Sequence, residues 1–207
     1  MSTNQESTKD RILRVATALF AANGIKATTV AQIEEAVGLR KGSGGVHRHF
    51  ETKDHLVRAI LEDQFQRTTD TRVTAEAWSL EDSEHLTGHL ERFGRYVLRE
   101  SEQFRESMLI GFREGASLYE RFPDLRQQSS LHTIRPLAQQ IAALPGATDT
   151  DHDALAFLML GPLLYHQAIK WLTNEAALEI TDERLVEQWA AVFSPLLRNL
   201  TEHDQEN

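Results

Sequence analysis

The chain has 207 residues, of which 41% are hydrophobic and 26% are charged, and its formal net charge is −9 at pH 7. This length and composition predict a folded protein of one or two compact domains and exclude a disordered tail. The sequence contains no cysteine, which excludes disulfide scaffolds, thiol nucleophiles, cysteine-ligated zinc and iron–sulfur clusters.

Two further features bear on the compartment. The longest apolar run, Ala154 to Tyr165, is too short to cross a bilayer, which takes about 20 residues. The first ten residues lack the basic and apolar regions of a signal peptide. We therefore expect a cytoplasmic protein that does not associate with a membrane.

The charge is unevenly distributed along the chain. Residues 1–60 hold nine Lys and Arg against six Asp and Glu, whereas residues 61–207 hold 13 against 25. The net charges of these two parts are therefore +3 and −12. This asymmetry favours an N-terminal head that faces a polyanion, joined to an acidic body.

Nearly every segment has apolar residues at helical spacing, and no stretch alternates in the manner of a strand. We expect an all-α protein of about nine helices, the first lying between a cap at Ser7 or Thr8 and a stop at Gly24. A domain boundary is expected near Glu51, because the first three helices are short and the later ones are longer. The later helices are expected from Thr52 towards Trp78, and at about Leu86–Val97, Phe104–Phe112, Asp124–Leu144, Asp151–Leu172 and Thr181–Leu200.

Residues 28–39 have the pattern of the first helix and turn of a helix-turn-helix motif. A capping box, Thr29-x-x-Gln32, begins the helix, and Gly38 supplies the turn. The second helix of such a motif enters the major groove of DNA, and here it is expected from Arg40 to Phe50. The alternative is a solvated helix in an ordinary bundle. The expected helix contains no acidic residue and offers phosphate-binding side chains at Arg40, Lys41, Ser43, His47, Arg48 and His49.

Three sequence blocks carry a family resemblance. They are Arg11-Ile-Leu-x-x-Ala16-x-x-Leu-Phe20-x-x-x-Gly24, Ala27-Thr-Thr-Val-Ala-x-Ile33-x-x-Ala36-Val-Gly38, and His49-Phe50-x-x-Lys53-x-x-Leu56. In this order and at this spacing, residues 9–62 resemble the DNA-binding domain of the tetracycline-repressor (TetR) family. The resemblance implies a helix-turn-helix DNA-binding domain at 1–51 and an effector-binding and dimerisation domain at 52–207. It also implies phosphate contacts by Thr28 or Thr29, Lys41, His47 and Lys53.

The sequence departs from the family pattern in the second helix of the motif. The family usually has Gly-(Val/Leu)-Ser-Lys-Gly-Thr-Leu-Tyr-x-His-Phe, whereas this chain has Gly38-Leu-Arg-Lys-Gly-Ser-Gly-Gly-Val-His-Arg-His-Phe50, which is two residues longer. His47 occupies the place of the common tyrosine. Each of Gly42, Gly44 and Gly45 lowers helix propensity by about 1 kcal/mol relative to alanine. The pattern predicts a second helix that is lengthened, irregular or ordered only on DNA.

Other chemistries find less support in the same residues. The glycines of residues 42–45 lack the preceding strand and the spacing of a nucleotide-binding loop. The pairs His47–His49 and His85–His89 are the possible metal ligands, but neither belongs to a His-Glu-x-x-His motif. No catalytic constellation is recognisable. We therefore expect no cofactor, no metal and no enzymatic activity.

Two expected helices carry more apolar surface than one stripe requires. The segment Asp151–Leu172 is apolar nearly all round, and Thr181–Leu200 is apolar over more than one face. This surplus predicts a self-complementary four-helix dimer interface, as the family resemblance also implies, with a thick monomeric core as the alternative. The expected interface residues are Leu155, Leu158, Leu163, Trp189, Val192, Phe193, Leu196, Leu197 and Leu200.

The body of the protein has features that favour a cavity. Pro136 and Pro162 lie inside expected helices, where each should remove a hydrogen bond and kink the helix. Nearby glycines and aromatic residues favour a mostly apolar pocket, with ordinary core packing as the alternative. The expected lining is Phe93, Tyr96, Met108, Phe112, Tyr119, His132, Met159, Tyr165 and His166.

Together these features predict a transcriptional regulator, expected to be a repressor, whose homodimer binds a palindromic operator in double-stranded DNA. A small hydrophobic or aromatic effector is expected to release it. The alternative is a ligand-binding or scaffolding helical dimer in which the glycine-rich segment no longer recognises DNA.

Overall fold

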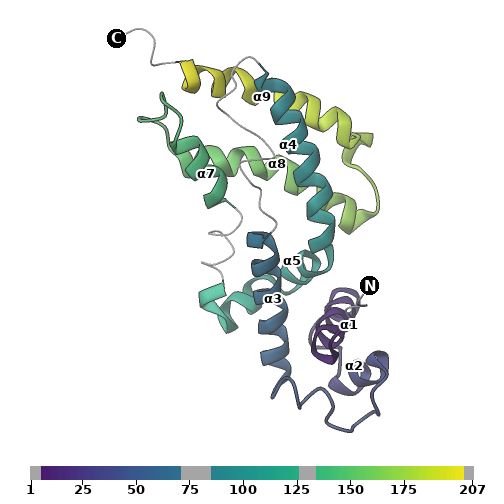
Figure 1. The fold of residues 1–207 in the computed structure, drawn as a ribbon. Coiled ribbons are helices and arrows are strands. Elements are labelled where there is room, and N and C mark those ends of the chain that lie inside the picture. The colour runs from purple at the N-terminus through teal and green to yellow at the C-terminus, as the bar shows by residue number, and fades with distance from the viewer. Residues whose placement is uncertain (1–5, 71–84, 126–133, 203–207) are drawn as a thin grey trace, which may run out of the picture. The chain divides into compact units, whose positions relative to one another are not determined.

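A computed structural model of the protein describes residues 6–70, 85–125 and 134–202 (Figure 1). Every regular element in these ranges is a helix, which confirms the all-α prediction. The elements are α1 (Thr8–Asn23), α2 (Val30–Val37), α3 (Lys53–Asp70), α4 (Leu86–Ser101), η1 (Glu102–Phe104), α5 (Arg105–Arg121), α7 (Arg135–Ala142), α8 (His152–Thr173), η2 (Ala177–Glu179) and α9 (Asp182–Glu202).

The chain forms two compact units. The first unit combines Met1–Gln66 with Arg105–Arg126, and the second combines Arg67–Phe104 with Gln127–Asn207. The first unit therefore extends beyond the N-terminal head and includes α5. The predicted boundary near Glu51 concerns the DNA-binding domain and stays a prediction.

The first unit is built on α1, which packs against α2 and α5. Its caps follow the sequence signals: Ser7 accepts a hydrogen bond from the N–H of Asp10 at 3.1 Å, and Gly24 ends the helix at a φ of 85°. The core includes the fully buried Phe20, Ile33 and Leu56. Residues far apart in the sequence thus form one hydrophobic core against which α2 packs.

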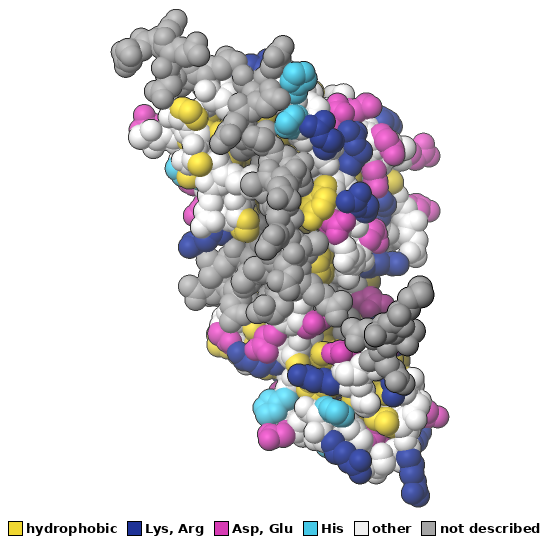
Figure 2. Space-filling view, in the orientation of Figure 1, with side chains coloured by type: hydrophobic (Ala, Val, Ile, Leu, Met, Phe, Trp, Pro, Cys, Tyr) yellow, Lys and Arg dark blue, Asp and Glu magenta, His cyan; other side chains and the backbone are white. Residues whose placement is uncertain are grey.

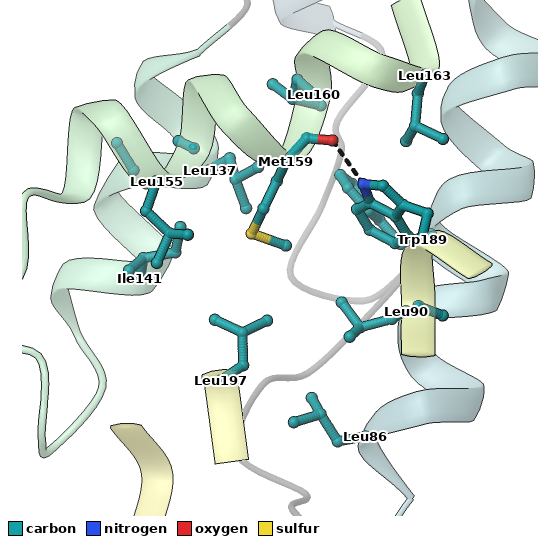
Figure 3. Packing of buried hydrophobic residues seen from close by; sticks show 14 of the residues in the cluster. Leu86, Leu90, Leu137, Ile141, Leu155, Met159, Leu160, Leu163, Trp189 and Leu197 are labelled. Atoms are coloured by element: carbon teal, nitrogen blue, oxygen red, sulfur yellow. Dashed lines mark hydrogen bonds between the residues drawn. The ribbon is translucent and has the colours of Figure 1, made fainter. Parts of the chain in front are cut away.

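The second unit is a bundle in which α4 packs against α9 and α8, while α7 packs against α8. Figure 3 shows its core, in which the indole Nε1 of Trp189 donates a hydrogen bond to the backbone oxygen of Met159 at 2.7 Å. Phe93 is also buried here and its ring lies 6.1 Å from that of Trp189. The unit therefore joins α4, α8 and α9 through large apolar side chains.

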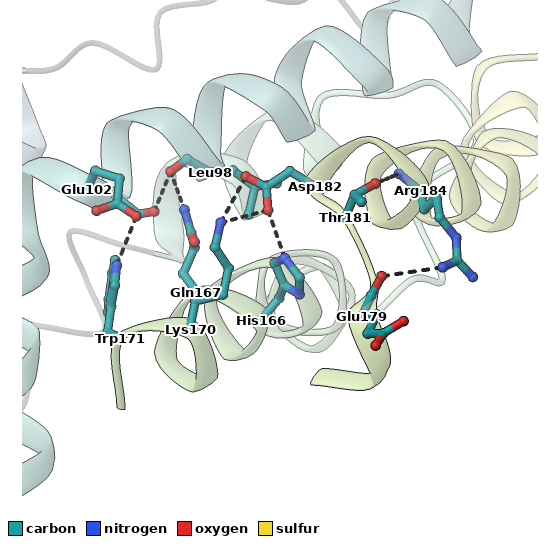
Figure 4. A network of polar contacts seen from close by, with 11 residues as sticks. Leu98, Glu102, His166, Gln167, Lys170, Trp171, Glu179, Thr181, Asp182 and Arg184 are labelled. Atoms are coloured by element: carbon teal, nitrogen blue, oxygen red, sulfur yellow. Dashed lines mark hydrogen bonds and ion pairs between the residues drawn. The ribbon is translucent and has the colours of Figure 1, made fainter. Parts of the chain in front are cut away.

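A polar network crosses the second unit (Figure 4). The carboxylate of Asp182 accepts hydrogen bonds from the Lys170 ammonium at 2.8 and 3.0 Å, and its Oδ1 lies 2.8 Å from Nε2 of His166. Gln167 donates to the backbone oxygen of Leu98 at 2.6 Å. These contacts connect α8 with the start of α9 and with α4.

One expectation about helix interiors is corrected by the structure, and one interruption is new. Pro136 lies in the first turn of α7, where its missing N–H has no helical partner to lose, so it starts a helix instead of kinking one. Helix α5 is interrupted at Gly115, whose φ is 40° and ψ is −120°. Pro162 does lie inside α8, as expected. Trp78 and His132 fall outside the described residues.

The described part of the chain contains no helix with the length and apolar character needed to cross a bilayer.

Candidate nucleic-acid interface

The turn between α1 and α2 is held together by two residues that the sequence places at the DNA surface. Thr28 is buried, and its hydroxyl donates to the backbone oxygen of Gly24 at 2.9 Å. The ammonium of Lys53 donates to the backbone oxygens of Ile25 at 2.6 Å and of Thr28 at 3.0 Å. Both side chains therefore satisfy backbone carbonyls of the turn.

Both ends of α2 carry strong local signals. The Thr29 hydroxyl accepts from the N–H of Gln32 at 3.2 Å, and the Gln32 side chain accepts from the N–H of Thr29 at 2.7 Å, which confirms the predicted capping box. Gly38 adopts the left-handed conformation, and the N–H of Leu39 donates to the backbone oxygen of Glu34 at 2.8 Å. Helix α2 therefore ends where the sequence predicts the turn.

The expected second helix of the motif is not a regular helix. Residues 40–50, which we call the reading segment, form consecutive turns. Gly42 and Gly44 both have a φ of +70°, a left-handed conformation that a right-handed helix cannot contain. A helical turn forms only near the end, where Arg48 donates to Gly44 and Phe50 donates to Val46 through their backbones. Of the alternatives left open by the sequence, the irregular segment is the one found.

The reading segment is anchored from beneath. The side chains of Val46 and Phe50 are buried in the core of the first unit. Gly45 is also buried, and a Cβ built there would lie 2.9 Å from Cδ1 of Leu39, so no larger residue fits without a shift. Because these contacts face inward, the remaining side chains of the segment face outward.

The outward side chains are those that the sequence predicts for DNA contact. Arg40, Lys41, Ser43, His47, Arg48 and His49 are all exposed. Figure 2 shows Lys, Arg and His side chains gathered at this end of the first unit. Lys41 also pairs with the exposed Glu35 at 3.1 Å, and Nδ1 of His47 lies 3.0 Å from the backbone oxygen of Glu51. Thr29 is exposed beside them.

Glu34 is not identified from the sequence as a functional residue of this region. Glu34 is 1% exposed, and its carboxylate accepts hydrogen bonds from the backbone N–H of Gly42 at 2.6 Å and of Val46 at 3.4 Å. Burial alone would raise the pKa of Glu34, but the N–H groups of Gly42, Val46 and Gly45 stabilise the carboxylate, so its pKa lies below the ordinary value. The sequence could have indicated the burial of Glu34, because this residue follows Val30 by four positions and so shares the inward face of α2.

The histidines of this surface do not form a metal site. Among the described residues, no group of three or more His, Asp or Glu side chains is placed to hold a metal ion.

The expected pocket residues are divided between the two units. Met108, Phe112 and Tyr119 lie in the first unit, and Phe112 is exposed. In the second unit, Phe93, Met159 and His166 are buried, Tyr96 is partly buried, and Tyr165 is exposed. His132 lies outside the described residues. The pocket as a set stays a prediction.

The expected dimer residues also divide into two groups. Leu155, Leu163, Trp189 and Leu197 are buried in the core of the second unit itself, because α8 and α9 each turn one apolar face inward. Phe193 and Leu200 are partly buried against the same core. Leu158, Val192 and Leu196 are exposed and remain available to a partner.

The chain is similar to known regulatory proteins. Residues 12–60 match the family model for bacterial regulatory proteins of the tetR family. The chain is 33% identical over 136 residues to the HTH-type transcriptional repressor Rv3405c of Mycobacterium tuberculosis, an alignment that covers 66% of this chain. The aligned region spans 63% of that relative, which is less than two thirds of its length. A shorter region is 35% identical to the HTH-type transcriptional repressor KstR2 of Mycolicibacterium smegmatis, over 31% of this chain and 34% of that protein.

Solved structures share the whole fold at low identity. A TetR-family regulator from Mesorhizobium loti matches 94% of this chain and 98% of its own with a TM-score of 0.66 and 19% identity. The regulator AibR, solved in complex with isovaleryl coenzyme A and operator DNA, matches 91% and 99% with a TM-score of 0.62 and 19% identity. The helix-turn-helix blocks and the matched model agree that residues 12–60 are a TetR-family helix-turn-helix segment, and the fold of the chain is that of solved TetR-family regulators.

Proposed function

We propose that the protein is a DNA-binding transcriptional repressor that acts in the cytoplasm and not as an enzyme. The observation that carries the proposal is the reading segment, which exposes Arg40, Lys41 and Arg48 on a backbone anchored by Val46 and Phe50. Fixed cationic side chains at the end of a helix-turn-helix unit suit phosphate and base contacts in the major groove. The relatives from the two mycobacterial species, which are described as repressors, support the same function.

We propose that the binding species is a homodimer formed through α8 and α9. On α8, Leu158, Tyr165 and Leu172 recur every seven residues and are 59%, 67% and 57% exposed. On α9, Val192 and Leu196 are exposed one helical turn apart. Two exposed apolar stripes on adjacent helices favour burial against a second copy, which presents the same stripes about a two-fold axis. A palindromic operator would require the two reading segments of such a dimer to lie about 34–36 Å apart.

The proposed effector is a small, mostly apolar or aromatic molecule bound in the second unit. Support comes from polar groups inside its apolar interior: His166 and Gln167 are both buried, and Oε1 of Gln167 has no partner among the described residues. A ligand group that satisfies this oxygen would gain what the unliganded protein lacks. The effector would release DNA only through a higher affinity for the released conformation than for the bound one.

Fluorescence anisotropy tests the DNA-binding proposal directly. DNA from upstream of the protein's own gene is titrated at two salt concentrations, with a scrambled duplex as competitor. Nanomolar binding that falls with salt and resists the competitor would support the proposal. Equal and weak binding to both duplexes would contradict it for this operator.

The irregular reading segment favours one alternative. A ligand-binding or scaffolding dimer would retain the second unit and lose sequence-selective DNA binding. Dimerisation and effector binding without DNA selectivity against any genomic fragment would establish this alternative.

A further inference from the structure

Glu34 is the one carboxylate among the described residues that is buried in the core of its unit. A buried carboxylate is stable only when hydrogen-bond donors replace its lost water. Here the donors all belong to the reading segment: the N–H of Gly42 lies 2.6 Å from Oε2, and that of Val46 lies 3.4 Å from Oε1. The N–H of Gly45 contributes from the same side.

The backbone of the segment is shaped for this contact. In a regular helix the N–H of Val46 would donate to the backbone oxygen of Gly42. The left-handed conformations of Gly42 and Gly44 accompany a path in which the N–H groups of Gly42 and Val46 instead reach one carboxylate. That carboxylate belongs to Glu34.

We propose that Glu34 is the positioning residue of the reading segment, and that its carboxylate replaces the hydrogen bonds of a recognition helix. This inference rests on the proposed function, because it assigns to Glu34 the geometry of the DNA-contacting side chains. The contact fixes the backbone before DNA arrives, so Arg40, Lys41 and Arg48 need not be ordered on binding. The backbone N–H groups that donate to the carboxylate also offset its negative charge, and so they reduce its repulsion of phosphate.

A pair of neighbouring substitutions separates positioning from charge. Glu34→Gln and Glu35→Gln each remove one negative charge from α2, but the Glu35 side chain is exposed and pairs only with Lys41 among the described groups. If charge alone mattered, both variants would bind operator DNA as tightly as the wild type or more tightly. A glutamine at position 34 keeps one acceptor oxygen but turns its NH2 group towards the other backbone donor, so it loses one of the two hydrogen bonds and the charge that strengthens them. We expect Glu34→Gln to weaken operator binding about tenfold or more, whereas Glu35→Gln binds equally or more tightly.

Hydrogen exchange tests the same contact without DNA, and the wild-type measurement does not depend on a variant that has to fold. The amides of Gly42 and Val46 are expected to exchange at least about tenfold more slowly than the amide of Ser43, which donates only to the backbone oxygen of Arg40 within a local turn. The Glu34→Gln substitution is expected to remove this difference in exchange rate. Fast exchange at Gly42 in the wild type, or equal operator affinity of the Glu34→Gln and Glu35→Gln variants, would overturn the inference. Failure of the wild type to bind DNA, with slow exchange retained, would count against the proposed function alone.

Discussion

The ammonium of Lys53, at the start of α3, donates hydrogen bonds to the backbone oxygens of both Ile25 and Thr28. This contact ties the second half of the motif to the turn between α1 and α2. Lys53 is one of the residues for which the family resemblance implies a phosphate contact. The structure gives its charge a second role inside the protein.

Replacing Lys53 with methionine keeps most of the apolar stem and removes the ammonium. We expect the free energy of unfolding of the first unit to fall by about 1–3 kcal/mol, because two carbonyls lose a charged donor. The dependence of operator affinity on salt should keep its slope, since an internal ammonium releases no counterion from DNA. A slope reduced by about one would show that Lys53 contacts phosphate instead. Chemical denaturation and anisotropy at several salt concentrations measure the two quantities.

The double variant Lys41→Ala with Arg48→Ala removes two exposed charges from the reading segment. We expect operator affinity to fall at least about a hundredfold and the salt slope to fall by about two, with the dimer intact. Arg92→Ala with Arg99→Ala is the matched control, since both residues are exposed on α4 and carry the same charge. Equal affinity of the two double variants at moderate salt would refute this placement of the DNA surface.

Two glycine substitutions are expected to change stability in opposite directions. Gly44 has a φ of +70°, and Gly111 lies inside α5 without a positive φ; an added Cβ meets nothing within 4 Å at either position. Gly44→Ala should destabilise the protein by about 1 kcal/mol through backbone strain, whereas Gly111→Ala should stabilise it by about 0.5–1 kcal/mol. Urea denaturation of both variants measures the difference. A stabilising Gly44→Ala would mean that the reading segment is helical in solution.

If the proposed dimer forms through α9, a charged substitution on the exposed face of this helix should change the molecular mass of the assembly from dimer to monomer. Val192→Asp places a charge in the exposed stripe, so we expect dissociation into monomers at micromolar concentration. Ala142→Glu, on the exposed side of α7, is expected to remain dimeric. Sedimentation equilibrium distinguishes the two states, and a Val192→Asp protein that remains dimeric would exclude this face.

The contact between Asp182 and Lys170 predicts an acid dependence of stability. Burial raises the pKa of Asp182, but the hydrogen bonds from Lys170 and His166 lower it by a larger amount. The pKa therefore lies below its ordinary value of 3.8. The unfolded state therefore binds the proton first. The stabilisation is complete above the ordinary pKa and is lost as the pH falls through the native pKa. Asp182→Asn should be less stable than the wild type near neutral pH, by about 1 kcal/mol or less because solvent screens the partly exposed pair, and this difference in stability should narrow in acid. Urea denaturation across acidic pH measures it, and a constant difference would contradict the assignment.

Local signals explain why the caps of α1 and α2 could be predicted. Ser7, Thr29 and Gln32 act on backbone groups three residues away, and Gly24 and Gly38 end their helices where positive φ values are needed. No tertiary contact is required to determine where α1 and α2 begin and end. Their boundaries can therefore be predicted from the local sequence.

The reading segment could not be predicted in the same way. Its glycines are compatible with a strained helix or with a turn, and the choice depends on Glu34, which lies eight residues before Gly42. The two faces of α8 pose a related problem, because Leu155 and Leu158 are equally apolar and only the position of α7 and α4 decides which is buried. The predicted role of Pro136 is wrong because it depends on where the helix begins. Since α7 begins at Arg135, Pro136 lies in its first turn and does not interrupt it.

In the proposed complex, two copies of the reading segment enter successive major grooves of an operator. Hydroxyl-radical footprinting of the wild-type protein on the DNA upstream of its gene tests this most directly. We expect two protected windows on one face of the duplex, with centres about 10 base pairs apart and related by a palindrome. Protection without sequence preference, or a single unpaired window, would contradict it.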